Sequence, residues 1–247
     1  MKQFATLESF FDSICSDLAA SVMQFESVKR KAINDDIISG WFGKPQDQDL
    51  LGPVTEQSEL IWRTLYLKQS VAEIRSVQDW AVAVPIRRVG LPKSEQLMFI
   101  WWVYLSRVNE FQDRLFKFYQ AARLRAPKAF ESKFVSSKKA FSKQFLLPIK
   151  PLIDLRNHWV HDSEPDFVEL KRLASLELFI TGYGIKPSSN QLVDVLKKEA
   201  RRVATSEKMR LIKTLRQNES SFKKLADLVV LYSSQYASLY IPTSTQD

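Results

Sequence analysis

The only two histidines of the chain, His158 and His161, lie three residues apart, directly after Arg156 and Asn157. An imidazole is the side chain whose unperturbed pKa lies near neutrality, and a guanidinium offers two parallel N–H donors to phosphate oxygens. A group that exchanges protons at neutral pH, placed next to a fixed cation, suits chemistry at a phosphate. This segment therefore indicates a site that handles phosphate groups.

The same segment has helical periodicity, so each residue can be assigned to a face at about 100° per residue. Arg156 falls within an apolar sector that also holds Leu152, Ile153, Leu155, Trp159 and Val160. A buried arginine needs a counter-charge, because removing an unpaired charge from water is strongly unfavourable. Glu110 and Asp113, in the middle of a long upstream segment, are the expected partners. An ion pair of this kind would tie two helices together.

The opposite face of the segment carries polar side chains only: Asp154, Asn157, His158 and His161. A carboxylate four residues before one imidazole, with a second imidazole three residues further on, has a spacing that could hold a metal. Helical sites built on two histidines usually take further ligands from other helices, and the chain has no further histidine. We therefore expect no metal here, and we assign Asp154 and His158 supporting roles beside the phosphate.

The composition excludes several familiar classes of site. The chain has only 6 glycines and lacks the Gly-x-Gly-x-x-Gly and Gly-x4-Gly-Lys patterns of nucleotide-binding loops. A single cysteine, Cys15, excludes a disulfide within the chain and a cysteine-based zinc site. Gly-x-Ser-x-Gly is absent, so no serine nucleophile can be assigned. We expect the protein to use no cofactor.

The chain also lacks the signals of export or membrane insertion. Residues 1–17 contain Glu8, Asp12 and Asp17, and so do not form the uninterrupted apolar core of a signal peptide. No apolar run approaches the about 20 residues that span a bilayer. We therefore expect a soluble, cytoplasmic protein that does not associate with membranes.

The whole chain has a formal net charge of +8, and the positive charge is concentrated in two segments. Residues 123–150 hold eight Lys and Arg against Glu131 alone, and residues 197–224 hold ten against three acids. Residues 1–60 have the opposite balance, five basic against ten acidic residues, and could shield the basic surface or form a partner site. Basic segments suit a polyanion such as RNA or DNA, although a solvated helix face has the same composition.

Nearly every long segment shows helical periodicity, and none shows the sustained alternation of a strand. Breaks rich in Gly, Pro and Ser separate the helices that we predict, at residues 6–33, 55–84, 93–125, 146 or 151 to 162, 163–179, 190–217 and 219–240. Residues 34–55 and 126–143 are predicted to be a loop and a linker. The aromatic residues of the helix over 93–125 are expected to fill the core rather than to stack on bases. We therefore expect an all-α multi-helix bundle that forms a single unit, residues 1–247.

The string from Leu155 to His161, LRNHWVH, resembles the signature of the HEPN superfamily of all-α domains. That signature is an arginine, four to six residues and a histidine, commonly with a polar residue after the arginine; here it takes the form Arg156-x4-His161 with Asn157 in the following position. The order of a long aromatic helix, a short motif helix and a further helix is also similar. On this resemblance residues 55–185 form a HEPN-like core, with an additional N-terminal helix and a basic C-terminal helical extension, residues 188–240.

The resemblance implies a metal-independent RNA endonuclease with Arg156, Asn157 and His161 in its active site. The 2′-hydroxyl of the RNA would attack the adjacent phosphorus and leave a 2′,3′-cyclic phosphate, while His161 exchanges protons and Arg156 stabilises the phosphoryl oxygens. Relatives form homodimers with a composite site, and many act with an antitoxin or another defence-system partner. The tyrosine that one toxin branch has two residues after the motif histidine is replaced by Ser163.

Two further interpretations stay open. One is a non-catalytic helical module that binds RNA or a protein and keeps Arg156 as a structural ion pair. The other is a metal-dependent helical enzyme built on Asp154, His158 and His161. The ribonuclease interpretation carries a geometric condition, because Arg156 and His161 lie about 140° apart on a straight helix. Either the helix ends near Val160, or Arg156 of one subunit meets His161 of another.

Overall fold

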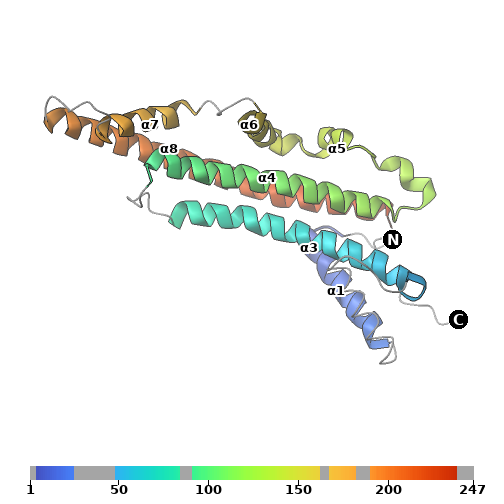
Figure 1. Ribbon diagram of the computed structural model, residues 1–247. Helices are drawn as coiled ribbons and strands as arrows, with labels where there is room; N and C mark the ends of the chain where they lie inside the picture. The colour runs from blue at the N-terminus through green and yellow to red at the C-terminus, as the bar shows by residue number, and fades with distance from the viewer. Residues whose placement is uncertain (1–3, 25–47, 84–90, 162–166, 182–189, 238–247) are drawn as a thin grey trace. The chain divides into compact units, whose positions relative to one another are not determined.

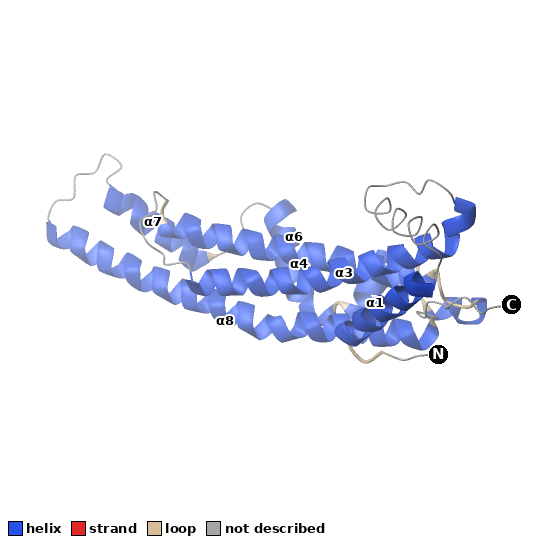
Figure 2. Ribbon diagram, turned by 90° about the horizontal axis from the view of Figure 1, so that it is seen from below, coloured by secondary structure: helices blue, strands red, loops and turns tan. Residues whose placement is uncertain are grey.

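The computed structural model of the 247-residue chain describes residues 4–24, 48–83, 91–161, 167–181 and 190–237. Within these ranges all regular structure is helical and no strand occurs, as Figures 1 and 2 show. The predicted all-α, multi-helix fold class is therefore confirmed. None of the helices in these ranges combines the length and the apolar character needed to cross a membrane.

The chain divides into two compact units, each assembled from separate stretches of sequence. The first unit takes residues 1–71, 111–147 and 223–247, and the second takes residues 72–110 and 148–222. Three helices have residues in both units: α3 (Gln48–Ala83), α4 (Lys93–Arg123) and α8 (Asn190–Tyr236). The expected core over residues 55–185 and extension over residues 188–240 follow the order of the chain and stay predictions.

The first unit has an aromatic core centred on Tyr119 of α4. The ring of this tyrosine contacts those of Phe134, Phe141, Phe145 and Tyr232, with centroids 4.9 to 6.3 Å apart. Its hydroxyl accepts a hydrogen bond from the backbone N–H of Val135 at 2.9 Å. Burial, the larger effect, raises the pKa of Tyr119 above its ordinary value. The same unit contains α1 (Leu7–Gln24), where the Leu7 N–H donates to the Asp227 carboxylate at 2.8 Å.

The second unit brings α6 (Lys150–His161) against α4 through a stack of aromatic rings. Phe167 lies just before α7 (Val168–Thr181), and its ring stacks on Trp101 of α4 with centroids 5.3 Å apart. The Phe167 ring also meets the Trp159 ring of α6 in an edge-to-face contact, with centroids 5.5 Å apart. Phe167 and Trp101 are both buried, so this contact fixes where Trp159 lies.

Glu177 of α7 caps the first turn of α4. Its carboxylate accepts hydrogen bonds from the backbone N–H groups of Lys93 and Ser94, at 2.8 and 3.1 Å, and from the Ser94 hydroxyl at 2.6 Å. The first N–H groups of a helix have no partner within the helix, and the helix dipole favours a negative charge there. The contact therefore determines where α4, which forms one side of the candidate site, begins.

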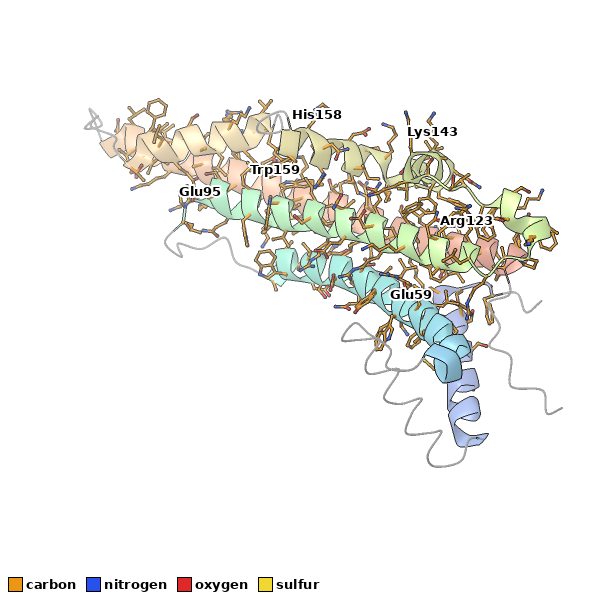
Figure 3. The ribbon with its side chains drawn as sticks, turned by 45° about the vertical axis from the view of Figure 1, so that its right-hand side comes forward. Glu59, Glu95, Arg123, Lys143, His158 and Trp159 are labelled. Atoms are coloured by element: carbon orange, nitrogen blue, oxygen red, sulfur yellow. The ribbon has the colours of Figure 1, made fainter. Side chains whose placement is uncertain are left out.

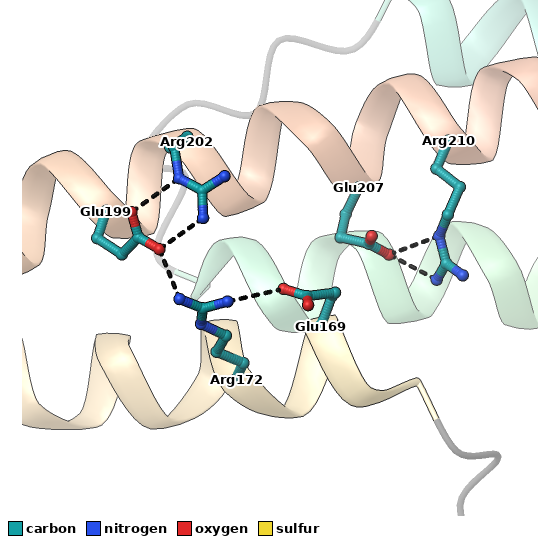
Figure 4. Close-up of polar contacts among 6 residues, drawn as sticks. All are labelled: Glu169, Arg172, Glu199, Arg202, Glu207 and Arg210. Carbon is teal, nitrogen blue, oxygen red and sulfur yellow. Dashed lines mark hydrogen bonds and ion pairs between the residues drawn. The ribbon is translucent and has the colours of Figure 1, made fainter.

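Ion pairs join α7 to α8 in the same unit, as Figure 4 shows. Arg172 of α7 donates to Glu199 of α8 at 2.8 Å, and Glu199 also accepts two hydrogen bonds from Arg202. The hydrogen bonds from Arg202, followed by the charges of Arg202 and Arg172, lower the pKa of Glu199. About two turns after Glu199, the buried carboxylate of Glu207 is held by Arg210 at 2.6 Å.

Three predicted element boundaries are wrong besides the start of α7, which lies at Val168 and not at residue 163. Residues 138–143, assigned to a linker, lie in helix α5 (Lys138–Phe145). The Ser137 hydroxyl caps this helix by accepting a hydrogen bond from the Ala140 N–H, and its two phenylalanines, four residues apart, are both buried. The last two predicted helices are one helix of 47 residues, α8, which contains no Gly or Pro. Asn218 lies at the predicted break, but α8 continues through it, and its side-chain amide donates a hydrogen bond to the Thr214 carbonyl one turn earlier.

The third error concerns the start of α3, at Gln48 rather than at Thr55. The loop signals Gly52 and Pro53 lie within the first two turns, where a proline removes only a single hydrogen bond near a helix end. The predicted boundaries of α4 are confirmed to within two residues. The rest of the predicted loop, residues 34–47, lies outside the described residues, as do residues 25–33 of the first predicted helix.

Candidate functional site

The residues of the LRNHWVH string lie on α6, which begins at Lys150 and ends at His161. Pro151 stands in its first turn, where the missing N–H would have no helical partner in any case. Leu152 is buried and anchors the helix, and Trp159 lies on the side of α6 toward α4 (Figure 3). Helix α6 thus turns Arg156, three residues before Trp159, toward the same side.

A pocket of about 330 Å³ lies between α4 and α6 within the second unit. Helix α6 contributes side chains at spacings of three and four residues, and α4 contributes side chains at spacings of three, four, seven and eight, so each helix offers one face. The lining residues are Trp102, Leu105, Ser106, Asn109 and Glu110 of α4, and Arg156, Trp159 and Val160 of α6. The pocket combines two indole rings, a cation and several hydrogen-bonding groups.

Arg156 lies half-buried in the wall of this pocket. Its Nη1 donates a hydrogen bond to Oδ1 of the neighbouring Asn157 at 3.2 Å. Among the residues that the structure describes, no carboxylate forms an ion pair with Arg156. A neutral amide oxygen does not balance the charge, so the guanidinium can still take an anion at the pocket.

The two acids expected to pair with Arg156 are held by other cations. Glu110 lines the pocket, and its Oε2 accepts a hydrogen bond from Arg107 at 2.6 Å; Arg107 also lies 3.4 Å from Glu73. The hydrogen bond to Glu110 is the main cause of the raised pKa of Arg107. Asp113 belongs to the first unit and forms an ion pair with Lys138 of α5. Within the described part of the chain, Glu110 thus shares the pocket with Arg156 without pairing to it.

The polar face of α6 reaches solvent at Asn157 and His158. Asn157 and His158 are exposed, and Figure 3 shows His158 on the outer side of the helix. Asp154 forms an ion pair with Lys150, four residues earlier. His161 is the last residue of α6, and its side chain lies outside the described residues. Helical backbone therefore continues past Val160, and the turn of about 140° between Arg156 and His161 holds for the backbone.

The described side chains contain no group of three or more His, Cys, Asp and Glu residues arranged to hold a metal ion. The side chain of His161 is not among them, so only Asp154 and His158 of the three residues with metal-ligand spacing are included. Of these, Asp154 has Lys150 as a partner, and His158 lies at the surface.

The pocket contains residues that the sequence did not single out. Trp102 was expected in the core with the other aromatic residues of α4, yet it is 52% exposed, whereas its neighbour Trp101 is 4% exposed. Ser106 and Asn109 lie one and two turns further along the same face. Their spacing along the sequence places Trp102, Ser106 and Asn109 on one face of α4, together with Glu110. Only the position of α6 shows that this face lines a pocket.

Comparison of the chain with protein-family models, with curated proteins and with solved structures gave no match.

Proposed function

We propose that this protein binds RNA with a phosphate at Arg156 and cleaves it without a metal ion, using His161 for proton transfer. The observation that carries the proposal is the half-buried guanidinium of Arg156, which lines a pocket and has no carboxylate partner among the described residues. A half-buried cation gains most from an anion that can accept two parallel hydrogen bonds. A phosphodiester provides two such oxygens.

Two groups of exposed cations support a polyanionic substrate. In the first unit, exposed lysines without an ion pair among the described residues include Lys128, Lys133, Lys139 and Lys143. In the second unit Lys198, Arg201, Lys213 and Arg216 have the same character on α8. Such cations attract a nucleic acid backbone without reading its sequence. The similarity of the α6 string to the HEPN signature points in the same direction.

The reaction that fits these residues is attack of a ribose 2′-hydroxyl on the adjacent phosphorus. The new bond closes a 2′,3′-cyclic phosphate, while the bond from phosphorus to the 5′-oxygen of the next nucleotide breaks and that oxygen leaves as a 5′-hydroxyl. Arg156 stabilises the negative charge that develops on the phosphoryl oxygens, and His161 takes or returns the proton. Because Arg156 and His161 lie about 140° apart around α6, one helix does not aim both at the same phosphate. The proposal therefore joins Arg156 of one copy to His161 of a second copy in a homodimer.

The test is incubation of purified protein with a mixed RNA pool in EDTA, followed by analysis of the new ends. Wild-type protein should leave 2′,3′-cyclic phosphates, and Arg156→Ala and His161→Ala should abolish cleavage. His158→Ala is the matched control, because it removes the other, exposed imidazole of the same helix. Equal loss in the His158 control, or cleavage that EDTA prevents, would contradict the proposal.

Co-expression of Arg156→Ala with His161→Ala tests the composite site. A mixed dimer would contain one intact site, formed by Arg156 of one copy and His161 of the other, so some cleavage should return. If both residues acted within one copy, the mixed dimer would contain no intact site. Recovery of no activity from a confirmed mixed dimer would therefore reject the two-copy arrangement.

A binding module without catalysis is the second candidate function. The observation that favours it is the exposed basic surface, which requires no active histidine to hold RNA. RNA that is bound through Arg156 but stays intact under all conditions of the cleavage assay would establish this alternative.

A further inference from the structure

Three aromatic rings on the surface of the second unit form a continuous row that ends at the pocket. Trp80 of α3 meets Phe99 of α4 edge to face with centroids 5.9 Å apart, and Phe99 stacks on Trp102 at 6.1 Å. Trp80, Phe99 and Trp102 are 36, 53 and 52% exposed. Trp102 is also part of the pocket wall. We call these three residues the aromatic row.

The row and the pocket together have the chemistry of a site for unpaired nucleotides. A volume of about 330 Å³ lies at the lower end of the range for small-ligand pockets, which suits one nucleotide and not a duplex. Trp102 and Trp159 offer ring faces or edges to a base, Arg156 offers a cation to its phosphate, and Asn109 offers an amide to the base edge. Bases that follow outside the pocket would next meet Phe99.

We propose that the aromatic row of Trp102, Phe99 and Trp80 is a base-stacking platform that selects single-stranded RNA for the Arg156 pocket. This inference rests on the RNA-binding function proposed for that pocket. A paired base has its two faces covered by its neighbours in the helix, so only unpaired bases can stack on protein rings. The platform therefore excludes duplex RNA by shape and leaves base identity to the pocket.

The size of the row favours a nucleic acid over a protein partner. A stable protein interface takes about 800 Å² from each side, which three partly exposed side chains do not supply. Stacking needs only the ring faces, and each base gains a useful share of the binding free energy from one ring. The row also ends at a cation rather than at a further apolar surface.

Binding should be measured with a fluorescent, 2′-O-methylated oligouridylate, which cannot be cleaved by attack of its own 2′-oxygen. Phe99→Ala and Trp80→Ala should each weaken binding roughly tenfold without changing its salt dependence, because no cation is lost. Phe99→Trp should retain affinity, and Phe99→Leu should lose it, because leucine keeps apolar area but has no ring face. A methylated hairpin duplex with the same number of phosphates should bind more weakly than the single strand.

Phe179→Ala is the matched control, since Phe179 is 54% exposed on α7 of the same unit and outside the row. It should leave binding unchanged. The inference is overturned if Phe99→Ala behaves like Phe179→Ala, if Phe99→Leu keeps full affinity, if duplex binds equally well, or if no RNA is bound. It is also overturned if Phe99→Ala alters only the oligomeric state, which would make the row a protein interface.

The two proposals fail in different ways. Binding to methylated RNA that depends on Phe99, without cleavage of ordinary RNA, would support the platform and reject the ribonuclease. Cleavage that depends on Arg156 and His161 but not on Phe99 would support the ribonuclease and reject the platform.

Discussion

Arg156 donates from Nη1 to the Oδ1 of its sequence neighbour Asn157 at 3.2 Å, so the motif arginine is oriented by an amide and, within the described ranges, is not neutralised by a carboxylate. The amide oxygen occupies one donor and leaves the positive charge at the pocket. This arrangement differs from the structural ion pair with Glu110 or Asp113 that the sequence predicted.

The substitution Asn157→Asp should replace the amide contact of Arg156 with an ion pair to a carboxylate. The new carboxylate has almost the same shape as the amide and would pair with Arg156, so it competes with phosphate for the guanidinium. RNA affinity should fall by at least about fivefold, the equivalent of about 1 kcal/mol for a partly exposed charge pair. In the Asn157→Ala variant the RNA affinity should fall by less, because alanine introduces no competing charge. Titration of labelled single-stranded RNA at fixed salt measures both, and equal affinities for the two variants would contradict the prediction.

Arg156→Met should leave the stability of the fold nearly unchanged. The methionine keeps much of the apolar contact of the arginine stem, and among the described residues no carboxylate loses an ion pair. The free energy of unfolding should change by less than about 0.5 kcal/mol. Thermal unfolding followed by circular dichroism provides the measurement. A loss of several kcal/mol would show instead that Arg156 is a structural residue.

Glu177→Ala should destabilise the second unit, because two backbone N–H groups and the Ser94 hydroxyl lose their acceptor at the start of α4. The expected loss is about 1–2 kcal/mol, or roughly 4 °C in Tm. Glu169→Ala on the same helix is the control. Its partner Arg172 lies 3.6 Å away in an exposed pair, so its Tm should hardly move. Similar shifts for the two variants would rule out a special role for the cap.

Tyr104→Phe should raise stability or leave it unchanged. The Tyr104 side chain is fully buried in α4, and its hydroxyl has no hydrogen-bond partner among the described residues. Burial accordingly raises the pKa of Tyr104. A buried hydroxyl without a partner costs about 1 kcal/mol or more, which phenylalanine avoids at the same ring size. Chemical denaturation should show an unchanged or higher midpoint; a clearly lower midpoint would reveal a hydrogen bond to this hydroxyl.

Glu199 should contribute to the pH dependence of stability on the acidic side only. Its pKa is lowered, first by the hydrogen bonds from Arg202 and then by the charges of Arg202 and Arg172. A carboxyl group whose pKa is lower in the folded state stabilises the fold above its unfolded pKa, and the effect disappears as the pH falls through the folded pKa.

The Tm difference between the wild type and Glu199→Gln should therefore be largest near neutral pH. It should shrink as the pH falls through the lowered pKa of Glu199 in the folded state, where the wild-type carboxyl becomes protonated. Thermal scans across this range make the comparison. A difference that stays constant down to the lowest pH would mean that the charge of Glu199 is not what its partners stabilise.

Local patterns of the sequence were sufficient to predict the helical class, the bounds of α4 and the placement of the LRNHWVH string on a short helix. These features depend on contacts three and four residues apart, which the chain displays directly. The same reasoning placed Asn157 and His158 on the polar face of that helix, and both side chains are exposed. Errors arose where local signals competed, as at Ser137, whose hydroxyl caps a helix within a stretch that is rich in loop-forming residues.

Only the tertiary structure decided which side chains meet. Glu110 faces the same pocket as Arg156 but pairs with Arg107, one turn earlier on its own helix, and no periodicity distinguishes these outcomes. Trp101 and Trp102 are adjacent and equally apolar, yet the first is buried under Phe167 and the second is exposed at the pocket. The physical reason is that a helix determines the directions of its side chains, whereas their partners depend on which other helices, distant in sequence, lie in those directions.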